Sequence, residues 1–180
     1  MAFATKLLRL HYLLPFLAIA TVVAANDEGV VDAAKQGDFS AVQGLIEQQV
    51  DVNEAQPDGA TALHWAAYRG DLQTAKLLIG AEADVNTAND YGATPLWLAA
   101  QDGNVAMVQE LLQAGADANA AFPSGETVLM TAAQSGDAAI VKHLLDHGAD
   151  INATESNMGQ NALMWAIADK HTDVVQALVE

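Results

Sequence analysis

The chain has 180 residues, a length that suits a single domain. Its 23 acidic residues outnumber 7 Lys and Arg, and the formal net charge of −16 argues against nucleic acid or an anionic membrane face as a partner, because both attract cations. The chain has no cysteine, which excludes disulfides, thiolate metal sites and a cysteine nucleophile. An acidic surface favours a basic partner, although solubility alone also explains it.

The first 25 residues have the three parts of a secretory signal. Lys6 and Arg9 give a basic start without acids, and residues 12–23 are nearly all apolar. Small residues follow and predict cleavage after Ala25, with cleavage after Ala24 as the nearest alternative.

The apolar run is shorter than the ~20 residues that a membrane-spanning helix needs. We therefore expect export without stable membrane insertion, to the periplasm in a Gram-negative bacterium and otherwise by secretion. An uncleaved anchor is the alternative.

A period of 33 residues organises the rest of the chain. Asn53, Asn86, Asn119 and Asn152 each close a similar phrase at this spacing, and sets of glycines and leucines keep the same period. Such a period indicates a solenoid, in which each unit stacks on its neighbours. We place the repeats at residues 27–53, 54–86, 87–119, 120–152 and 153–180, the last of them incomplete, within a domain spanning 26–180.

The sequence pattern within each repeat predicts two short helices, and the segment 59–86 illustrates this. Thr61 can cap the first helix, on which Ala66 and Ala67 share the buried face, and a second helix is expected over 72–79. Helices of about two turns are not stable alone in water, so stability must come from stacking. The paired alanines at 66–67, 99–100 and 132–133 are predicted to let the first helices of adjacent repeats approach closely.

Several side chains carry more specific expectations. Trp65 and Trp165 share one repeat position and are expected in the core, whereas Trp97 is expected to be partly buried. Glu82 stands where other repeats have Gly, so Gly80 is expected to move that helix end.

The segments 92–100, GATPLWLAA, and 111–119, LLQAGADAN, resemble the ankyrin repeat, whose signature is G-x-T-P-L-x-x-A-A followed by L-L-x-x-G-A-D-x-N. The resemblance covers essentially residues 27–180. It implies an all-α ankyrin-repeat solenoid of helix-turn-helix units joined by β-turn fingers, with a concave side that usually binds a protein. It also implies that His64 bonds Thr61 and locks the start of its helix.

The first and last repeats depart from that pattern. The first lacks the G-x-T-P-L opening and begins with acids, which suits an N-terminal cap. The last has one extra residue in its finger, Asn161 in place of Thr, and Lys170 and His171 in place of the Gly-polar turn. Because the chain stops inside the second helix of this repeat, we expect it to be the front part of a longer protein.

The sequence offers little for catalysis or for a cofactor. His143 and His147 have metal-ligand spacing on a helix, but their segment is an ordinary helix end for this family. No serine lies in a nucleophile motif, and no phosphate-binding loop or EF-hand loop occurs. We predict a non-catalytic protein without metal or cofactor.

The resemblance places partner contacts at the finger tips and at the ends of the first helices. Tyr68, Arg69, Tyr91 and Phe122 are of types enriched in binding hot spots, although incidental surface residues are the alternative. Mapped by register, the predicted partner-binding residues are Tyr68, Arg69, Asp90, Tyr91, Gln101, Asp102, Phe122 and Gln134.

Three functions remain open at this point. The first is an exported scaffold that binds a protein partner. A partner with a basic surface would suit the acidic chain. The second is the targeting arm of a longer enzyme whose catalytic domain lies beyond residue 180. The third is a structural spacer.

Overall fold

The computed structural model describes residues 29–180, so the predicted signal at residues 1–25 lies outside the described residues. The described chain folds into ten α-helices in five stacked pairs, and it contains no strand beyond two isolated β-bridges. The pairs are α1 (Val30–Gln36) with α2 (Phe39–Glu47), α3 (Ala62–Tyr68) with α4 (Leu72–Gly80), α5 (Pro95–Gln101) with α6 (Val105–Gln113), α7 (Val128–Ser135) with α8 (Ala138–Asp146), and α9 (Ala162–Ala168) with α10 (Thr172–Val179). The predicted all-α solenoid is confirmed.

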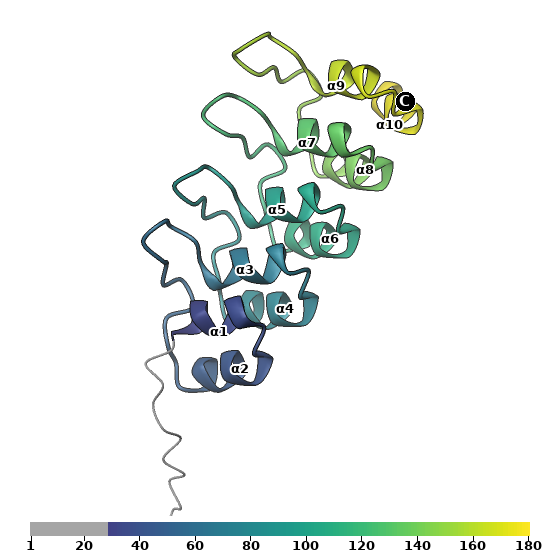
Figure 1. The fold of residues 1–180 in the computed structure, drawn as a ribbon. Helices are drawn as coiled ribbons and strands as arrows, with labels where there is room; N and C mark the ends of the chain where they lie inside the picture. The colour runs from purple at the N-terminus through teal and green to yellow at the C-terminus, as the bar shows by residue number, and fades with distance from the viewer. Residues whose placement is uncertain (1–28) are drawn as a thin grey trace, which may run out of the picture.

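The helices form two rows, with the loops between pairs projecting from one side (Figure 1). Each first helix packs on the first helix of the next pair, and each second helix likewise packs on the next second helix. The first helices pack more closely, because the paired alanines lie between them without exposed surface. The six residues concerned, Ala66, Ala67, Ala99, Ala100, Ala132 and Ala133, bear out their predicted role.

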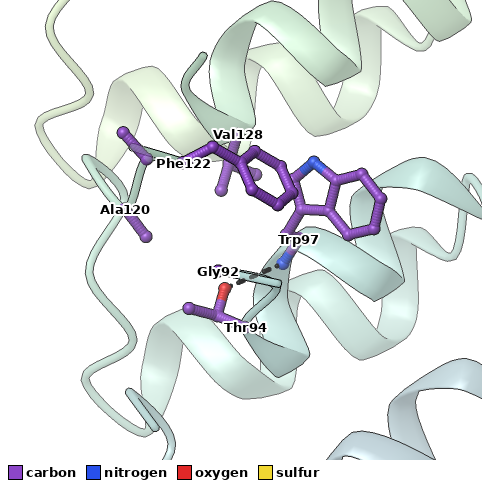
Figure 2. Close-up of a pocket in the computed structure, with 7 residues that line it drawn as sticks. Gly92, Thr94, Trp97, Ala120, Phe122 and Val128 are labelled. Atoms are coloured by element: carbon purple, nitrogen blue, oxygen red, sulfur yellow. Dashed lines mark hydrogen bonds between the residues drawn. The ribbon is translucent and has the colours of Figure 1, made fainter. Parts of the chain in front are cut away.

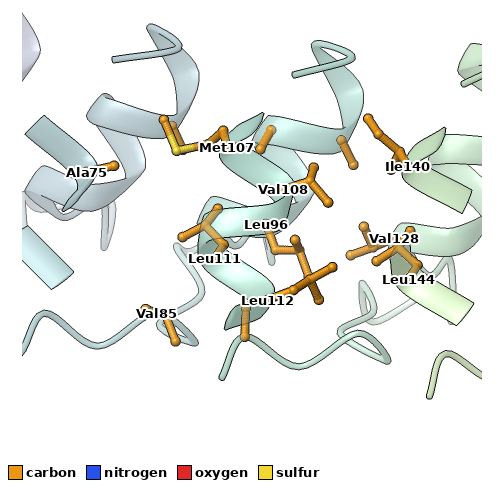
Figure 3. Close-up of a cluster of buried hydrophobic side chains, with 14 of the residues drawn as sticks. Ala75, Val85, Leu96, Met107, Val108, Leu111, Leu112, Val128, Ile140 and Leu144 are labelled. Carbon is orange, nitrogen blue, oxygen red and sulfur yellow. The ribbon is translucent and has the colours of Figure 1, made fainter. Parts of the chain in front are cut away.

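One apolar core runs through all the pairs (Figure 3). Met107 and Leu111 of α6 reach toward Ala75 of α4, while Ile140 and Leu144 of α8 continue the row in the next repeat. Since these helices have only seven to nine residues, they depend on this shared core for stability.

The loops between repeats are held by asparagines at the 33-residue period. Asn86 Nδ2 donates to Gly115 O (3.1 Å), and Asn86 Oδ1 accepts from the amide of Asp117 (2.8 Å). Asn53 and Asn119 make the same pair of bonds to the repeat that follows each of them. We call this series the asparagine ladder.

The prediction that Gly80 moves the end of α4 is wrong. Gly80 is the last residue of α4 and does not move the helix end, because α6 ends at the same register, at Gln113. Glu82 instead adopts the left-handed conformation, with φ of 66°, that Gly115 adopts in the next repeat with φ of 90°. The stacked backbone requires this conformation at the same register, and the exposed Glu82 side chain accepts it at a cost of about 1–2 kcal/mol.

The last pair keeps the geometry of the others despite its departures in sequence. Asn161 caps α9 by accepting from the amide of Met164 (3.0 Å), and Lys170 takes the left-handed φ of 63° where other repeats have Gly. The extra residue widens the finger, in which the Glu155 amide bonds Gln160 O (3.0 Å).

Glu155 stabilises this wider finger from within. The side chain is 5% exposed and accepts hydrogen bonds from the amides of Asn157 (2.6 Å), Met158 (2.9 Å) and Gln160 (3.0 Å). The bond from Gln160 is the main reason that the pKa of this carboxyl is lower than its ordinary value of 4.5.

Among the described helices, none combines the length and the apolar composition that crossing a membrane requires.

Candidate protein-binding surface

The fingers and the first helices together form one side of the molecule, which we call the finger–helix face. The fingers are residues 56–60, 89–93, 122–126 and 155–160. Each is a tight turn, as in the bond from the Gln56 amide to Ala60 O (2.9 Å). A backbone bond from Asp90 N to Asp58 O (2.9 Å) joins the first finger to the second, and one from Ser156 N to Ser124 O (2.7 Å) joins the third to the fourth. The fingers therefore form a supported rim beside the row of first helices.

An open recess of about 220 Å³ lies on this face between the second and third repeats. It is lined by Asp58 and Ala60 of one finger, by His64, Trp65 and Tyr68 of α3, by Asn89 of the next finger and by Leu98 of α5. Fingers and first helices of two repeats thus contribute to one concave site.

His64 supports the inner side of this recess. The ring is 3% exposed, its Nδ1 accepts from the Thr61 amide (3.1 Å) and lies 2.8 Å from Thr61 Oγ1, and its Nε2 donates to Ala93 O (3.0 Å). Burial lowers the pKa of His64 below its ordinary value of 6.5, so the ring is neutral. The predicted lock on the helix start is confirmed, and the ring also ties α3 to the next finger.

The structure corrects the placement of two tryptophans. Trp65 and Trp165 are only partly buried, and they pack against the core cluster rather than lie within it. Trp65 lines the recess, where its Nε1 donates to Gln56 Oε1 (3.1 Å) and its ring lies edge-to-face with Tyr68, with the centroids 5.9 Å apart.

Apart from Phe122, the predicted partner-binding residues fall into three groups. Tyr68 is 63% exposed and lines the recess, whereas Tyr91 is 74% exposed on its finger and does not line it. Arg69 is exposed but donates from Nη1 to Lys35 O (3.3 Å), which links the first two repeats. The remaining polar residues, Asp90, Gln101, Asp102 and Gln134, are exposed along the same face.

Phe122 differs from the other predicted contacts. Its half-buried ring packs edge-to-face on Trp97, with centroids 4.9 Å apart, and the two rings fill the space above Gly92 (Figure 2). Trp97 is partly buried, as predicted, and its Nε1 donates to Thr131 Oγ1 (2.9 Å). Phe122 therefore joins the third and fourth repeats and leaves no volume for a ligand at this point.

The sequence reasoning placed Asp58 at a finger tip but did not single out Trp65 or Leu98 as site residues. A signal for them exists within the chain: the register position of Trp65 holds Leu98 in the next repeat and Thr131 in the one after, while the neighbouring alanines stay constant. Variation at one register position beside constant positions marks a side chain that the stacking does not constrain.

The histidine pair considered as a metal site makes ordinary local bonds. Gln109 Nε2 donates to His143 Nε2 (2.7 Å), and His147 Nδ1 donates to His143 O (2.8 Å). Within residues 29–180, no three His, Cys, Asp or Glu side chains are grouped so that they could hold a metal ion.

Comparison with known families agrees with this architecture. A family model described as ankyrin repeats (3 copies) matches the chain twice, over residues 30–122 and over residues 120–180. A search of curated proteins found no match. The family match covers most of the chain and coincides with the stacked helix pairs and their fingers. The chain therefore belongs to the ankyrin-repeat family.

Proposed function

We propose that the protein is a non-catalytic scaffold that binds a protein partner through its finger–helix face, in an exported compartment. Ankyrin repeats are generally protein–protein interaction modules, which supports the class of function. The observation that carries the proposal for this chain is the recess between the second and third repeats, which has an exposed Tyr68 at its edge.

The exposed aromatics support this choice of surface. Tyr68 and Tyr91 each leave more than half of their surface in solvent, although aromatic side chains gain much from burial. Tyrosine is enriched among residues that dominate binding energy, because it supplies a large contact area with a polar tip. A partner that covers both rings would span the second and third repeats.

The charge of the face supports a basic partner. Asp58, Asp90 and Asp102 lie on or beside it, and the chain as a whole carries a formal net charge of −16. An excess of one sign speeds the encounter with a partner of the other sign, and this effect weakens as salt screens the charges.

The composition of residues 1–25, with their basic start, apolar run and small-residue cleavage site, supports the exported compartment. We place the protein in the periplasm if its source is a Gram-negative bacterium and outside the cell otherwise. A fusion of the full chain to a reporter that is active only after export, compared with the same fusion lacking residues 1–25, tests this part.

Affinity capture tests the binding function. The full chain, immobilised and exposed to an extract of the exported fraction, should retain a specific protein that mass spectrometry identifies. A Tyr68→Ala, Tyr91→Ala variant should keep its circular dichroism spectrum and retain less of that protein.

A matched control is Gln73→Ala, Gln113→Ala, which changes two exposed residues on the second helices and should leave capture unchanged. Equal capture by the tyrosine variant and the parent would show that the partner uses another surface.

A further inference from the structure

We propose that the recess between the second and third repeats is a subsite for an arginine side chain of the protein partner. The inference rests on the proposed function and narrows it, because it names the chemistry that this part of the face recognises.

An indole ring held in place forms one wall of the recess. The bond from Trp65 Nε1 to Gln56 Oε1 (3.1 Å) and the edge contact with Tyr68 fix the ring without a ligand. This ring already holds a cation within the chain, since Lys35 Nζ lies 4.7 Å from its centroid. Lys35 comes from the first repeat and does not line the recess, which is bounded by the second and third repeats alone.

A carboxylate completes the recess. Asp58 Oδ1 accepts from the Ala60 amide (3.1 Å), which orients the group within the turn of its finger. Among the described residues no group donates to the other carboxylate oxygen of Asp58, and the salt bridge between Lys76 and Glu110 does not involve Asp58. The nearby His64 uses both ring nitrogens and is neutral, so it does not compensate the charge of Asp58.

Among the side chains of a protein partner, arginine complements the indole of Trp65 and the carboxylate of Asp58 best. Its planar guanidinium can stack on an indole while it donates to a carboxylate, and its methylene groups can cover apolar surface such as Leu98 and Ala60. A lysine offers the charge without the planar stack. An apolar side chain would remove water from Asp58 without giving it a donor, which is unfavourable.

A short peptide tests the subsite on the full chain. The probe is the capped peptide Gly-Ser-Arg-Ser-Gly, and its matched forms carry citrulline or norleucine in place of arginine. The readout is the indole N–H signal of Trp65 in nitrogen–proton correlation spectra, assigned by its loss in Trp65→Leu. The arginine peptide should shift this signal, and the citrulline peptide, which has the same shape without the charge, should bind about tenfold more weakly.

Two variants separate the contributions. Asp58→Asn should weaken the arginine peptide about tenfold, and Asp146→Asn, which removes the same charge from the exposed end of α8, should leave its affinity within about twofold. Trp65→Leu places at this position the residue that the next repeat has at Leu98, and it should weaken binding about fivefold while the fold is kept. Because this variant has lost the indole signal, its affinity is read from the backbone amide signals of Ala60 and Leu98, which also line the recess.

Defined results would overturn the proposal. Equal affinity of the arginine and norleucine peptides would make the recess an apolar subsite, and the absence of any Trp65 shift at about 10 mM arginine peptide would remove the subsite altogether. A captured partner whose affinity is unchanged by Asp58→Asn would refute the subsite and leave the binding function standing. A peptide shift with no partner captured from the exported fraction would refute the binding function alone.

Discussion

The contacts between successive repeats, which we call the joints, and the finger–helix face differ in how much their residues vary along the chain. At the joints the same residues recur from repeat to repeat, as the buried alanines and the asparagine ladder show. On the face the residues change, so that a single register position holds Trp65, Leu98 and Thr131 in turn. The difference teaches that stability is distributed along the whole stack, whereas recognition can be concentrated in two neighbouring repeats.

The largest effect is expected at a joint. Ala100→Leu should lower the free energy of unfolding by ~1–3 kcal/mol, because the added methyl and methylene groups have no space between α5 and its neighbours. A thermal melt should show a loss of about 2–4 °C for each kcal/mol. The control Ala106→Leu lies on an exposed position of α6 and should change stability by less than about 0.5 kcal/mol. Equal melts for Ala100→Leu and the parent would contradict the described packing.

The asparagine ladder predicts the next effect. Asn86→Ala removes two hydrogen bonds to the following repeat and should cost about 1–2 kcal/mol in urea unfolding. Asn152 has the same register, but its side chain makes no hydrogen bond within residues 29–180, so Asn152→Ala should cost less than about 0.5 kcal/mol. Similar losses in both variants would mean that the inter-repeat bonds do not explain the effect.

Acidification should weaken the contact that His64 makes between α3 and the next finger. The pKa of His64 is lower in the folded chain than its ordinary value of 6.5, so the unfolded chain binds the proton more readily. The contribution of His64 to stability is therefore complete above pH 6.5 and is lost as the pH falls from 6.5 toward the lower, folded pKa.

Melting temperatures between about pH 7.5 and about pH 5.5 measure this loss. His64→Met, which places at this position the residue that the fourth repeat has at Met130, should melt lower throughout and show a flatter pH dependence. Parallel pH dependences in the parent and the variant would exclude His64 as the cause.

The smallest effect on stability is expected at the face. Tyr91→Ala should change the free energy of unfolding by less than about 0.5 kcal/mol, because the ring is 74% exposed and packs on no aromatic neighbour among the described residues. Chemical denaturation measures this value. A loss above about 1 kcal/mol would show that the stability of the finger depends on the ring. It would contradict the view that residues of the face contribute little to stability.

The sequence was sufficient for the features that the stacking imposes. The period located the helices, the alanine pairs and the loops, because each depends on a residue that recurs at a fixed spacing. The lock between Thr61 and His64 was implied by the resemblance to the ankyrin repeat, and the hydrogen bonds between the two residues confirm it.

The features that it missed depend on contacts between different repeats. Trp65 was expected in the core because its repeat position commonly holds Leu or another apolar residue in this family, but in the structure its ring lines the recess. Phe122 was expected to contact a partner, and only the folded stack brings Trp97 under its ring. Glu82 shows a third case, in which the backbone of the stack overrides the conformational preference of the side chain.

The asparagine ladder also bears on how such a chain can lengthen. Each asparagine side chain bonds only to a carbonyl and an amide of the following repeat, which any residue except proline supplies at that register. A tandem duplication of 33 residues would therefore carry its own connection to both neighbours, and no compensating substitution would be needed at the new boundary. The same main-chain recognition lets one repeat acquire a new surface without disturbing its attachment.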